Sequence, residues 1–272
     1  NQNGLVTAKG SGTATITIKN SESKVSTNCV INVINDGNFL IPTGDALLKC
    51  DKDGNLLFEH ILDKETVRTI FDAFNKYGME PALFTTEGRI SLLPLEEREI
   101  YTRDVFIPAI QVNHPDMKYT LDDYRELVDD VIFVDGQEAL LNSDHRILKI
   151  TSNSPDHESL KKLRVELEKI PGLAVVSTVP TDIEITSINA QKGSSLLDYA
   201  KKDGLKPEEI IAIGDSENDY SMLSIPGIHS VAMENACDMI RNICVYQTRA
   251  NTRDGIAYII NCILTDRENF KL

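Results

Sequence analysis

A six-residue stretch in the last quarter of the chain concentrates oxygen-bearing side chains. In Gly214-Asp215-Ser216-Glu217-Asn218-Asp219, four of the six side chains are acids or amides. Mg²⁺ prefers hard oxygen ligands of this kind, and a short loop can bring several of them together. Asn and Asp are also frequent in solvated turns and at helix starts. The residue types alone therefore leave two interpretations, a cation-binding loop and a polar turn.

The elements around this stretch predict a parallel sheet. Ile210–Ile213 is a short apolar run that predicts a buried strand ending directly at the loop, and Ile183–Ile185 predicts an earlier strand. Helices are expected at 194–202, 221–223, 236–243 and 254–264, and further strands at 229–232 and 245–248. Short apolar strands that alternate with helices are typical of a parallel sheet covered on both faces. Because ligands bind beyond the carboxyl ends of such strands, the position of the loop favours a binding role.

Residues 44–180 predict a different module, of α+β type. Ala46–Cys50 and Asn55–Phe58 flank the turn residues 51–54 and predict a hairpin. Asp63 is the expected N-cap of a helix reaching Tyr77, whose apolar residues fall on one face. Further strands are expected at 81–85, 146–151 and 173–177, and helices at 121–128 and from Pro155 to about 169.

Composition restricts the class of partner. The 272 residues carry a formal charge of −14, which argues against nucleic acid or an anionic membrane surface as the main partner. An anionic small substrate remains compatible with this charge, since a bound cation reverses the local field.

No apolar run suggests membrane insertion and no signal peptide is visible, although the chain opens on Asn1 rather than Met. The five cysteines lack CxxC spacing, so buried free thiols and a cytoplasmic location are expected. A leader peptide and a further domain upstream would instead indicate an extracellular location. No obligate protein partner is evident.

The first 36 residues show small, Thr-rich segments between glycine turns. Gly4–Ala8, Gly10–Thr17 and Cys29–Val33 follow the patterns G-L-V-T-A, G-x-G-T-A-T-I-T and C-x-V-x-V. Residues 1–36 thereby resemble the C-terminal portion of a bacterial immunoglobulin-like domain of group 2. The resemblance implies a short antiparallel β segment, which we do not expect to fold alone because a half sandwich leaves strand edges unpaired.

From about residue 44 onward, the chain resembles the Cof-type branch of the haloacid dehalogenase superfamily. The matching residues occur in the family's order, as Glu184-Ile185, Lys192-Gly193, Gly214–Asp219, Met222-Leu223, Val231–Ala236 and Asp254-Gly255. The resemblance implies an α/β fold, with a Rossmann-like core half at 181–272, an α+β cap at 44–180 and the β segment of residues 1–36 in front.

The same resemblance implies a site and a reaction. In the family, an aspartate attacks the phosphoryl group of a small substrate such as a sugar phosphate, and water then hydrolyses the aspartyl-phosphate. By match, Asp215 would bind Mg²⁺ and Lys192 would contact the phosphoryl oxygens. Asn218 would hydrogen-bond the phosphate, and Asp219 would orient Lys192 or the surroundings of the metal. Without the resemblance, Lys192 would be interpreted as an exposed lysine at a helix start.

The nucleophile motif of the family, D-x-D-G-T after an apolar strand, is not evident. One lookalike exists, Asp51-Lys52-Asp53-Gly54-Asn55, with Thr86 following 35 residues after Asp51. Leu47–Cys50 is a poor buried strand and Asn55 replaces Thr, so we interpret these residues as a cap hairpin. The alternative, Asp51 as nucleophile and Asp53 as general acid/base, stays open.

Three functions are compatible with this sequence. One is a phosphatase of small phosphorylated metabolites, and another is a catalytically dead module that keeps its Mg²⁺ and phosphate contacts. The third is a cell-surface or scaffold protein whose immunoglobulin-like segment is the functional part. If Asp51 is only a hairpin residue, we predict phosphate binding with very little turnover, because catalytic groups that act as a unit are strongly non-additive.

Overall fold

The computed structural model describes residues 60–265, except for the side chains of residues 126, 127 and 264. Before residue 60 it describes only the backbone of five strands, at 12–19, 26–33, 39–43, 46–50 and 56–58. Its contacts divide the chain into two compact units, 1–59 and 60–272. The second unit contains Lys192, Asp215, Asn218 and Asp219, the residues assigned to the site by the family resemblance.

The first unit contains two antiparallel sheets. β1 (Gly12–Lys19) pairs with β2 (Ser26–Val33), and β4 (Ala46–Cys50) pairs with both β3 (Phe39–Thr43) and β5 (Leu56–Phe58). The antiparallel pairing of β4 with β5 is the one predicted for the hairpin. Asp51 and Asp53 lie outside the described residues, as do the turns and side chains of the predicted immunoglobulin-like segment, residues 1–36.

Residues 60–187, here called the six-stranded module, form one sheet with the order β10-β11-β9-β6-β7-β8. Its neighbouring strands are antiparallel except for β7 and β8, which are parallel. The strands are β6 (Ala82–Thr85), β7 (Arg89–Ser91), β8 (Ile132–Phe133), β9 (Ile147–Asn153), β10 (Leu173–Val176) and β11 (Asp182–Ser187). The helices are α1 (Lys64–Tyr77), α2 (Leu95–Tyr101), the π-helical turn η1 (Thr102–Phe106), α3 (Ile107–Asn113), the 3₁₀ turn η2 (Asp122–Tyr124), α4 (Arg125–Asp129), α5 (Gln137–Leu141) and α6 (His157–Leu167).

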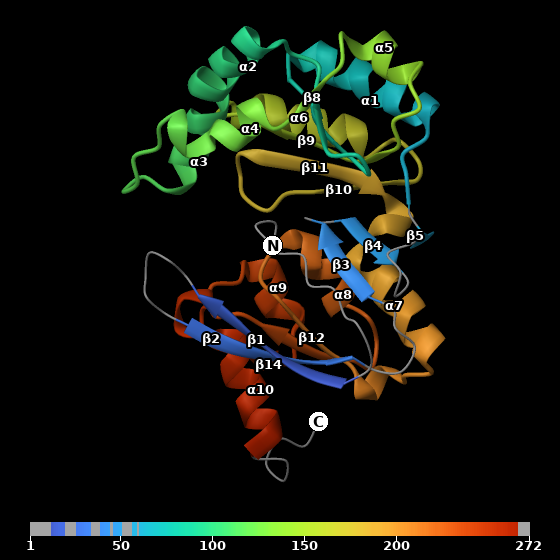
Figure 1. Cartoon of the computed structure of the whole chain (residues 1–272), viewed down its shortest axis with the longest axis vertical. Coiled ribbons are helices and arrows are strands. Elements are labelled where there is room, and N and C mark those ends of the chain that lie inside the picture. The colour runs from blue at the N-terminus through green and yellow to red at the C-terminus, as the bar shows by residue number, and fades with distance from the viewer. Residues whose placement is uncertain are drawn as a thin grey trace. The chain divides into compact units, whose positions relative to one another are not determined.

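The core of this module lies between the sheet and helices α1, α5 and α6, which cover the same face (Figure 1). Leu83, Ile150 and Ile185 stand in register on β6, β9 and β11, and all three are fully buried. Phe74 of α1 and Leu163 of α6 are equally buried in the same cluster. Burying large apolar side chains in this way is the main stabilising contribution to the module.

Two helix starts show how local sequence sets these elements. Asp63 caps α1 as predicted, since its Oδ1 accepts a hydrogen bond from the Thr66 amide at 2.9 Å. For α6 the prediction was less accurate: the cap is Asp156, which accepts from the amides of Glu158 and Ser159. Pro155 therefore precedes the helix and does not belong to its first turn.

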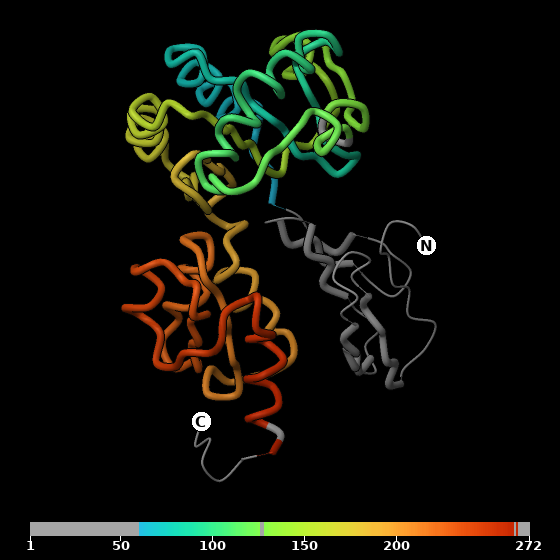
Figure 2. Tube along the Cα trace, turned by 90° about the vertical axis from the view of Figure 1, so that its left-hand side faces the viewer, coloured from blue at the N-terminus to red at the C-terminus, as the bar shows by residue number. Residues whose placement is uncertain are grey.

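The strand predicted at Ile183–Ile185 belongs to a different sheet from the one expected. It is part of β11, which pairs with β10 and β9 of the six-stranded module and makes no ladder with the parallel strands. The trace then runs through residues 188–191 into α7 (Figure 2). The domain bounds given by the sequence, 1–36, 44–180 and 181–272, stay a prediction.

Residues 188–265, here called the three-stranded module, contain the predicted Rossmann-like parallel sheet. Its strands are β12 (Ile211–Gly214), β13 (His229–Ala232) and β14 (Tyr246–Gln247), in that order. Its helices are α7 (Lys192–Asp203), α8 (Tyr220–Leu223), α9 (Asp238–Ile243) and α10 (Gly255–Thr265), with 3₁₀ turns η3 (Ile188–Ala190), η4 (Pro207–Glu209), η5 (Glu217–Asp219) and η6 (Asn251–Arg253). Ala212, Leu223, Ile228 and Ile240 form the centre of its core.

The strand before the acidic loop is less buried than predicted. Within the described residues, β12 lies at the edge of its sheet, and Ile211 and Ile213 are half-buried. Ala212 and Gly214 point the other way and are buried, which follows from the two-residue period of a strand. The apolar run therefore correctly predicts the strand but not its place in the sheet.

Two further expectations concern membrane insertion and the cysteine thiols. Among the helices that the structure describes, none is long and apolar enough to cross a bilayer. Cys237, Cys244 and Cys262 are free thiols as expected, but Cys237 is exposed and the other two are half-buried, so the expectation of burial was wrong for them.

Candidate active site

Lys192 and Asp219 form an ion pair at the carboxyl end of the parallel sheet. Lys192 opens α7, Asp219 closes the turn η5, and the lysine Nζ donates to Asp219 Oδ1 at 2.7 Å. The Asp219 side chain is only 8% exposed and that of Lys192 27%. Burying a carboxylate costs folding free energy unless a donor or cation pairs with it, and Lys192 is that partner here. The pair in turn holds the lysine ammonium beside the acidic loop.

Asp219 also shapes the loop that precedes it. Its Oδ2 accepts hydrogen bonds from the backbone amides of Asp215, at 2.9 Å, and Ser216, at 3.2 Å. One carboxylate thus fixes both the loop backbone and Lys192. The geometry is the one that an orienting role for Asp219 requires, and that role remains a prediction.

Two glycines allow the site to pack this closely. A Cβ added at Gly214 would lie 2.5 Å from the Asp219 Cβ, and one added at Gly193 would lie 2.2 Å from the backbone oxygen of Ser221. Both distances are far below van der Waals contact. The glycines next to Lys192 and Asp215 are therefore required because α7 and η5 approach their neighbours without room for a side chain.

Asp215 stands at the carboxyl end of β12, half-buried and held by two side chains. Asn235 Nδ2 donates to its Oδ2 at 2.8 Å, and Ser216 Oγ donates to its Oδ1 at 3.2 Å. Asn235 in turn accepts from the Asn251 amide at 3.0 Å, so the loops after β12, β13 and β14 are tied together. The sequence contained a signal for Asn235, an amide just after the neighbouring strand, but no role in the site was assigned to it.

Asp215 is the loop carboxylate that could hold a cation. Its partners leave further oxygen lone pairs available, whereas Asp219 is committed to Lys192 and to two backbone amides. Across the described residues, no group of three or more His, Cys, Asp and Glu side chains is arranged to hold a metal ion. Since Mg²⁺ usually takes one or two protein carboxylates and completes its shell with water and phosphate, Asp215 fits the ion as a single protein ligand.

Asn218 and Glu217, the remaining polar residues of the loop, lie next to each other in η5 and are both half-buried. Glu217 reaches the six-stranded module: its carboxylate accepts from both Nη atoms of Arg164, one of them at 2.9 Å, and from the Ser177 amide at 2.9 Å. Burial raises the pKa of Glu217, but the hydrogen bonds from Arg164 and Ser177 outweigh burial and hold that pKa below its ordinary value. Glu217 is therefore an anion at neutral pH. The sequence did not predict this contact.

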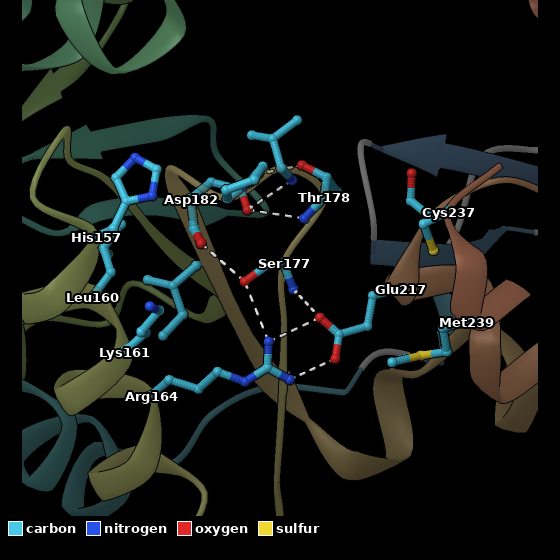
Figure 3. A pocket seen from close by; sticks show the side chains of 14 residues that line it. His157, Leu160, Lys161, Arg164, Ser177, Thr178, Asp182, Glu217, Cys237 and Met239 are labelled. Atoms are coloured by element: carbon cyan, nitrogen blue, oxygen red, sulfur yellow. Dashed lines mark hydrogen bonds and ion pairs between the residues drawn. The ribbon is translucent and has the colours of Figure 1, made fainter. Parts of the chain in front are cut away.

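A cavity of about 570 Å³ opens beside this contact (Figure 3). One wall comes from α6 and the segment before β11, and the other from Ser216, Glu217 and the start of α9. Figure 3 shows the Arg164 guanidinium hydrogen-bonded to the Glu217 carboxylate among the residues that line it. The cavity lies next to the acidic loop, so a molecule held by the loop has space to extend between the two modules.

Comparisons with known proteins find similar sequences over much of the chain. A family model described as haloacid dehalogenase-like hydrolase matches residues 23–260, a range that begins inside the predicted immunoglobulin-like segment and includes the whole site. The 5-amino-6-(5-phospho-D-ribitylamino)uracil phosphatase YwtE of Bacillus subtilis is 35% identical over 128 residues, 47% of this chain and 44% of that protein. The chain spans about half the length of the first curated relatives that it matches, with shares of 44%, 47% and 52%.

Solved structures show a similar fold. A haloacid dehalogenase-like hydrolase from B. subtilis superposes with a TM-score of 0.64 at 23% identity, over 79% of this chain and 75% of that chain. A sugar phosphatase of haloacid dehalogenase subclass IIB superposes with a TM-score of 0.58 at 18% identity, over 83% of this chain and 75% of that chain.

Proposed function

The chain belongs to the haloacid dehalogenase-like hydrolases, and from this membership we propose that it binds the phosphate group of small phosphorylated compounds such as sugar phosphates. The observation that carries the proposal is the Lys192–Asp219 pair at the carboxyl end of the parallel sheet, beside Asp215. Paired in this way, the lysine ammonium is fixed at the place where an anion would arrive.

Four polar residues of the site have a proposed part. Lys192 neutralises charge on the phosphate oxygens, and the Asn218 amide donates a hydrogen bond to them. Asp219 holds Lys192 and the loop backbone in place. Asp215 holds Mg²⁺, which supplies positive charge to the bound phosphate. The phosphatases among the relatives support this assignment, as does the sugar phosphatase of similar fold.

We further propose that this chain binds phosphate esters but hydrolyses them very slowly. Hydrolysis in this family needs an aspartate nucleophile, and the one candidate in the sequence is Asp51. The antiparallel pairing of β4 with β5 favours a hairpin at that point, whereas a nucleophile loop would follow a buried parallel strand.

Turnover tests this proposal directly. With Mg²⁺ and a panel of sugar phosphates and an aryl phosphate, we expect the rate to be at least about a thousandfold below that of the B. subtilis relative, because charge stabilisation without a nucleophile leaves only a small part of the catalysis. The assay includes Asp51→Asn and Asp215→Asn. Fast turnover that Asp51→Asn abolishes would show that Asp51 is the nucleophile and would contradict the proposal.

Asp215→Asn is expected to weaken Mg²⁺ binding about tenfold, since a neutral amide replaces the single proposed carboxylate ligand. Calorimetric titration of the full chain with Mg²⁺ measures the change. Asp198→Asn, an exposed position of α7, removes the same charge away from the site and is expected to bind as the native chain does. Equal affinity of the native and Asp215→Asn chains would show that the metal binds elsewhere.

A further inference from the structure

The first turn of α7 is not capped by the residue that precedes it. Gln191 stands at the N-cap position, but its side chain accepts no hydrogen bond from the turn. The first amides of a helix lack intrahelical partners, and a cap side chain usually accepts from the second or third of them. In α7 the acceptor comes from another helix, since the Gly193 amide donates to Ser221 Oγ of α8 at 3.1 Å.

This hydrogen bond holds the backbone of Lys192. The amide belongs to the peptide that joins Lys192 to Gly193, so Ser221 fixes the main chain directly at the lysine. The other end of the residue is held separately, because Lys192 Nζ donates to Asp219 Oδ1 at 2.7 Å. Asp219 and Ser221 are two residues apart. One short segment therefore holds the lysine at both its backbone and its ammonium group.

Close packing keeps the Ser221 hydroxyl at this amide. Gly193 is buried, and a Cβ added to it would lie 2.2 Å from the Ser221 carbonyl oxygen. The backbones of the two residues are thus in direct contact. A buried amide that lost its acceptor here would have little access to water, which makes the hydrogen bond costly to remove.

The two contacts of Lys192 differ in what an arriving anion does to them. A phosphate oxygen would compete with Asp219 for the three donors of the ammonium group. The hydrogen bond from the Gly193 amide to Ser221 involves none of those donors. It can therefore keep the lysine in place while the ammonium group changes partner.

We propose that Ser221 is a positioning residue for phosphate binding, whose hydroxyl takes the place of the missing N-cap of α7 and so holds Lys192 beside the acidic loop. The inference rests on the proposed function, because it takes Lys192 as the residue that binds the phosphate. Ser221 acts through the Gly193 amide and is assigned no contact with the phosphate itself.

Replacing Ser221 with alanine removes the acceptor and leaves the backbone contact in place. The affinity of Ser221→Ala for inorganic phosphate, measured with Mg²⁺ by calorimetry of the full chain, is expected to fall about fivefold. This is the factor that the loss of one cap hydrogen bond typically costs, here because fewer chains keep Lys192 in its binding position. Ser221→Thr keeps the hydroxyl and is expected to restore most of the affinity.

Ser224→Ala is the matched control. Ser224 follows α8 directly, and its side chain is exposed. The change removes a hydroxyl from the same segment without touching α7, and phosphate is expected to bind as it does to the native chain. An equal loss in Ser224→Ala and Ser221→Ala would show a general effect on the segment and would overturn the inference.

A double-mutant cycle separates positioning of Lys192 from general stabilisation. In a Lys192→Met chain the positioned group is already absent, so adding Ser221→Ala is expected to change phosphate affinity less than about twofold. Phosphorus NMR titration measures the weak binding of these chains. A residue that merely stabilised the fold would cause the same fivefold loss in both backgrounds, and that result would contradict the proposed role.

The Gly193 amide gives a second readout that needs no phosphate. Its hydrogen exchange is expected to be about fivefold faster in Ser221→Ala and native-like in Ser221→Thr and Ser224→Ala. Equal exchange in Ser221→Ala and the native chain would show that Ser221 does not cap α7 and would overturn the inference.

Failure of the inference and failure of the proposed function give different results. If the native chain binds phosphate and Ser221→Ala binds it equally well, the inference is wrong and the proposed function stands. If the native chain binds no phosphate, the proposed function fails and the positioning role fails with it. Faster exchange of the Gly193 amide in Ser221→Ala would then still support the cap between α8 and α7.

Discussion

Replacing Lys192 with methionine is expected to weaken the binding of inorganic phosphate about a hundredfold. A hydrogen bond to a charged group contributes roughly 1.5–3 kcal/mol, and each 1.4 kcal/mol corresponds to a factor of ten in affinity. Methionine keeps much of the length of the side chain but removes its charge and its donors. The loss therefore reports on the ammonium group and not on packing. Calorimetry with phosphate and Mg²⁺ measures it.

Two controls separate this effect from a general one. Lys201→Met changes an exposed lysine at the other end of the same helix and is expected to bind phosphate normally. Lys192→Arg keeps the charge and is expected to retain part of the affinity. Lys192→Met also leaves Asp219 buried without its lysine, so the unfolding transition of each variant must be recorded. If a folded Lys192→Met chain bound phosphate as the native chain does, the proposed role of Lys192 in phosphate binding would be wrong.

Gly193→Ala is expected to lower the free energy of unfolding by about 3 kcal/mol, at the upper end of what overpacking a closely packed site costs. At an open helix position the same change would stabilise the chain by up to about 1 kcal/mol, because alanine is the better helix former. Here the new Cβ would meet the Ser221 carbonyl oxygen at 2.2 Å, and backbone cannot rotate out of the way. The steric cost therefore outweighs helix propensity.

Chemical denaturation of the full chain tests this, with Asp198→Ala as the control at an exposed position of α7. The control is expected to be neutral or slightly stabilising. The Gly193 variant should also bind phosphate more weakly, since displacing the start of α7 moves Lys192 away from Asp219. A Gly193→Ala chain as stable as the native one would mean that α7 and α8 separate easily, contrary to the contact seen here.

The sequence was most informative where a local rule determines the structure. Asp63 was predicted as a cap because a carboxylate one position before a helix can accept from its free amides, and it does so. His229–Ala232 was predicted as a strand with its bounds unchanged. Lys192 and Asp219 are 27 residues apart, and only the family resemblance suggested that they meet. Their hydrogen bond agrees with that expectation.

Features that depend on tertiary contacts could not be predicted from the sequence. The alternation of Ile183 and Ile185 fits any half-buried strand, so it did not indicate which sheet would receive it. The half-buried state of Ile211 and Ile213 depends on β12 lying at an edge, which composition does not reveal. Arg164 and Glu217 are 53 residues apart and belong to different modules. No periodicity or spacing rule links such a pair.

The bond network around Asn235 has a consequence for the evolution and engineering of this site. Asn235 joins the Asp215 carboxylate to the Asn251 amide, and Glu234 beside it accepts from the Ala250 amide and pairs with Arg253. A loop transplanted alone from another protein would arrive without the donors or acceptors that its neighbours supply. Substitutions in the three loops should therefore show epistasis, each tolerated in one background and harmful in another. For grafting or recombination, residues 215–219, 233–237 and 249–254 form a single unit of exchange.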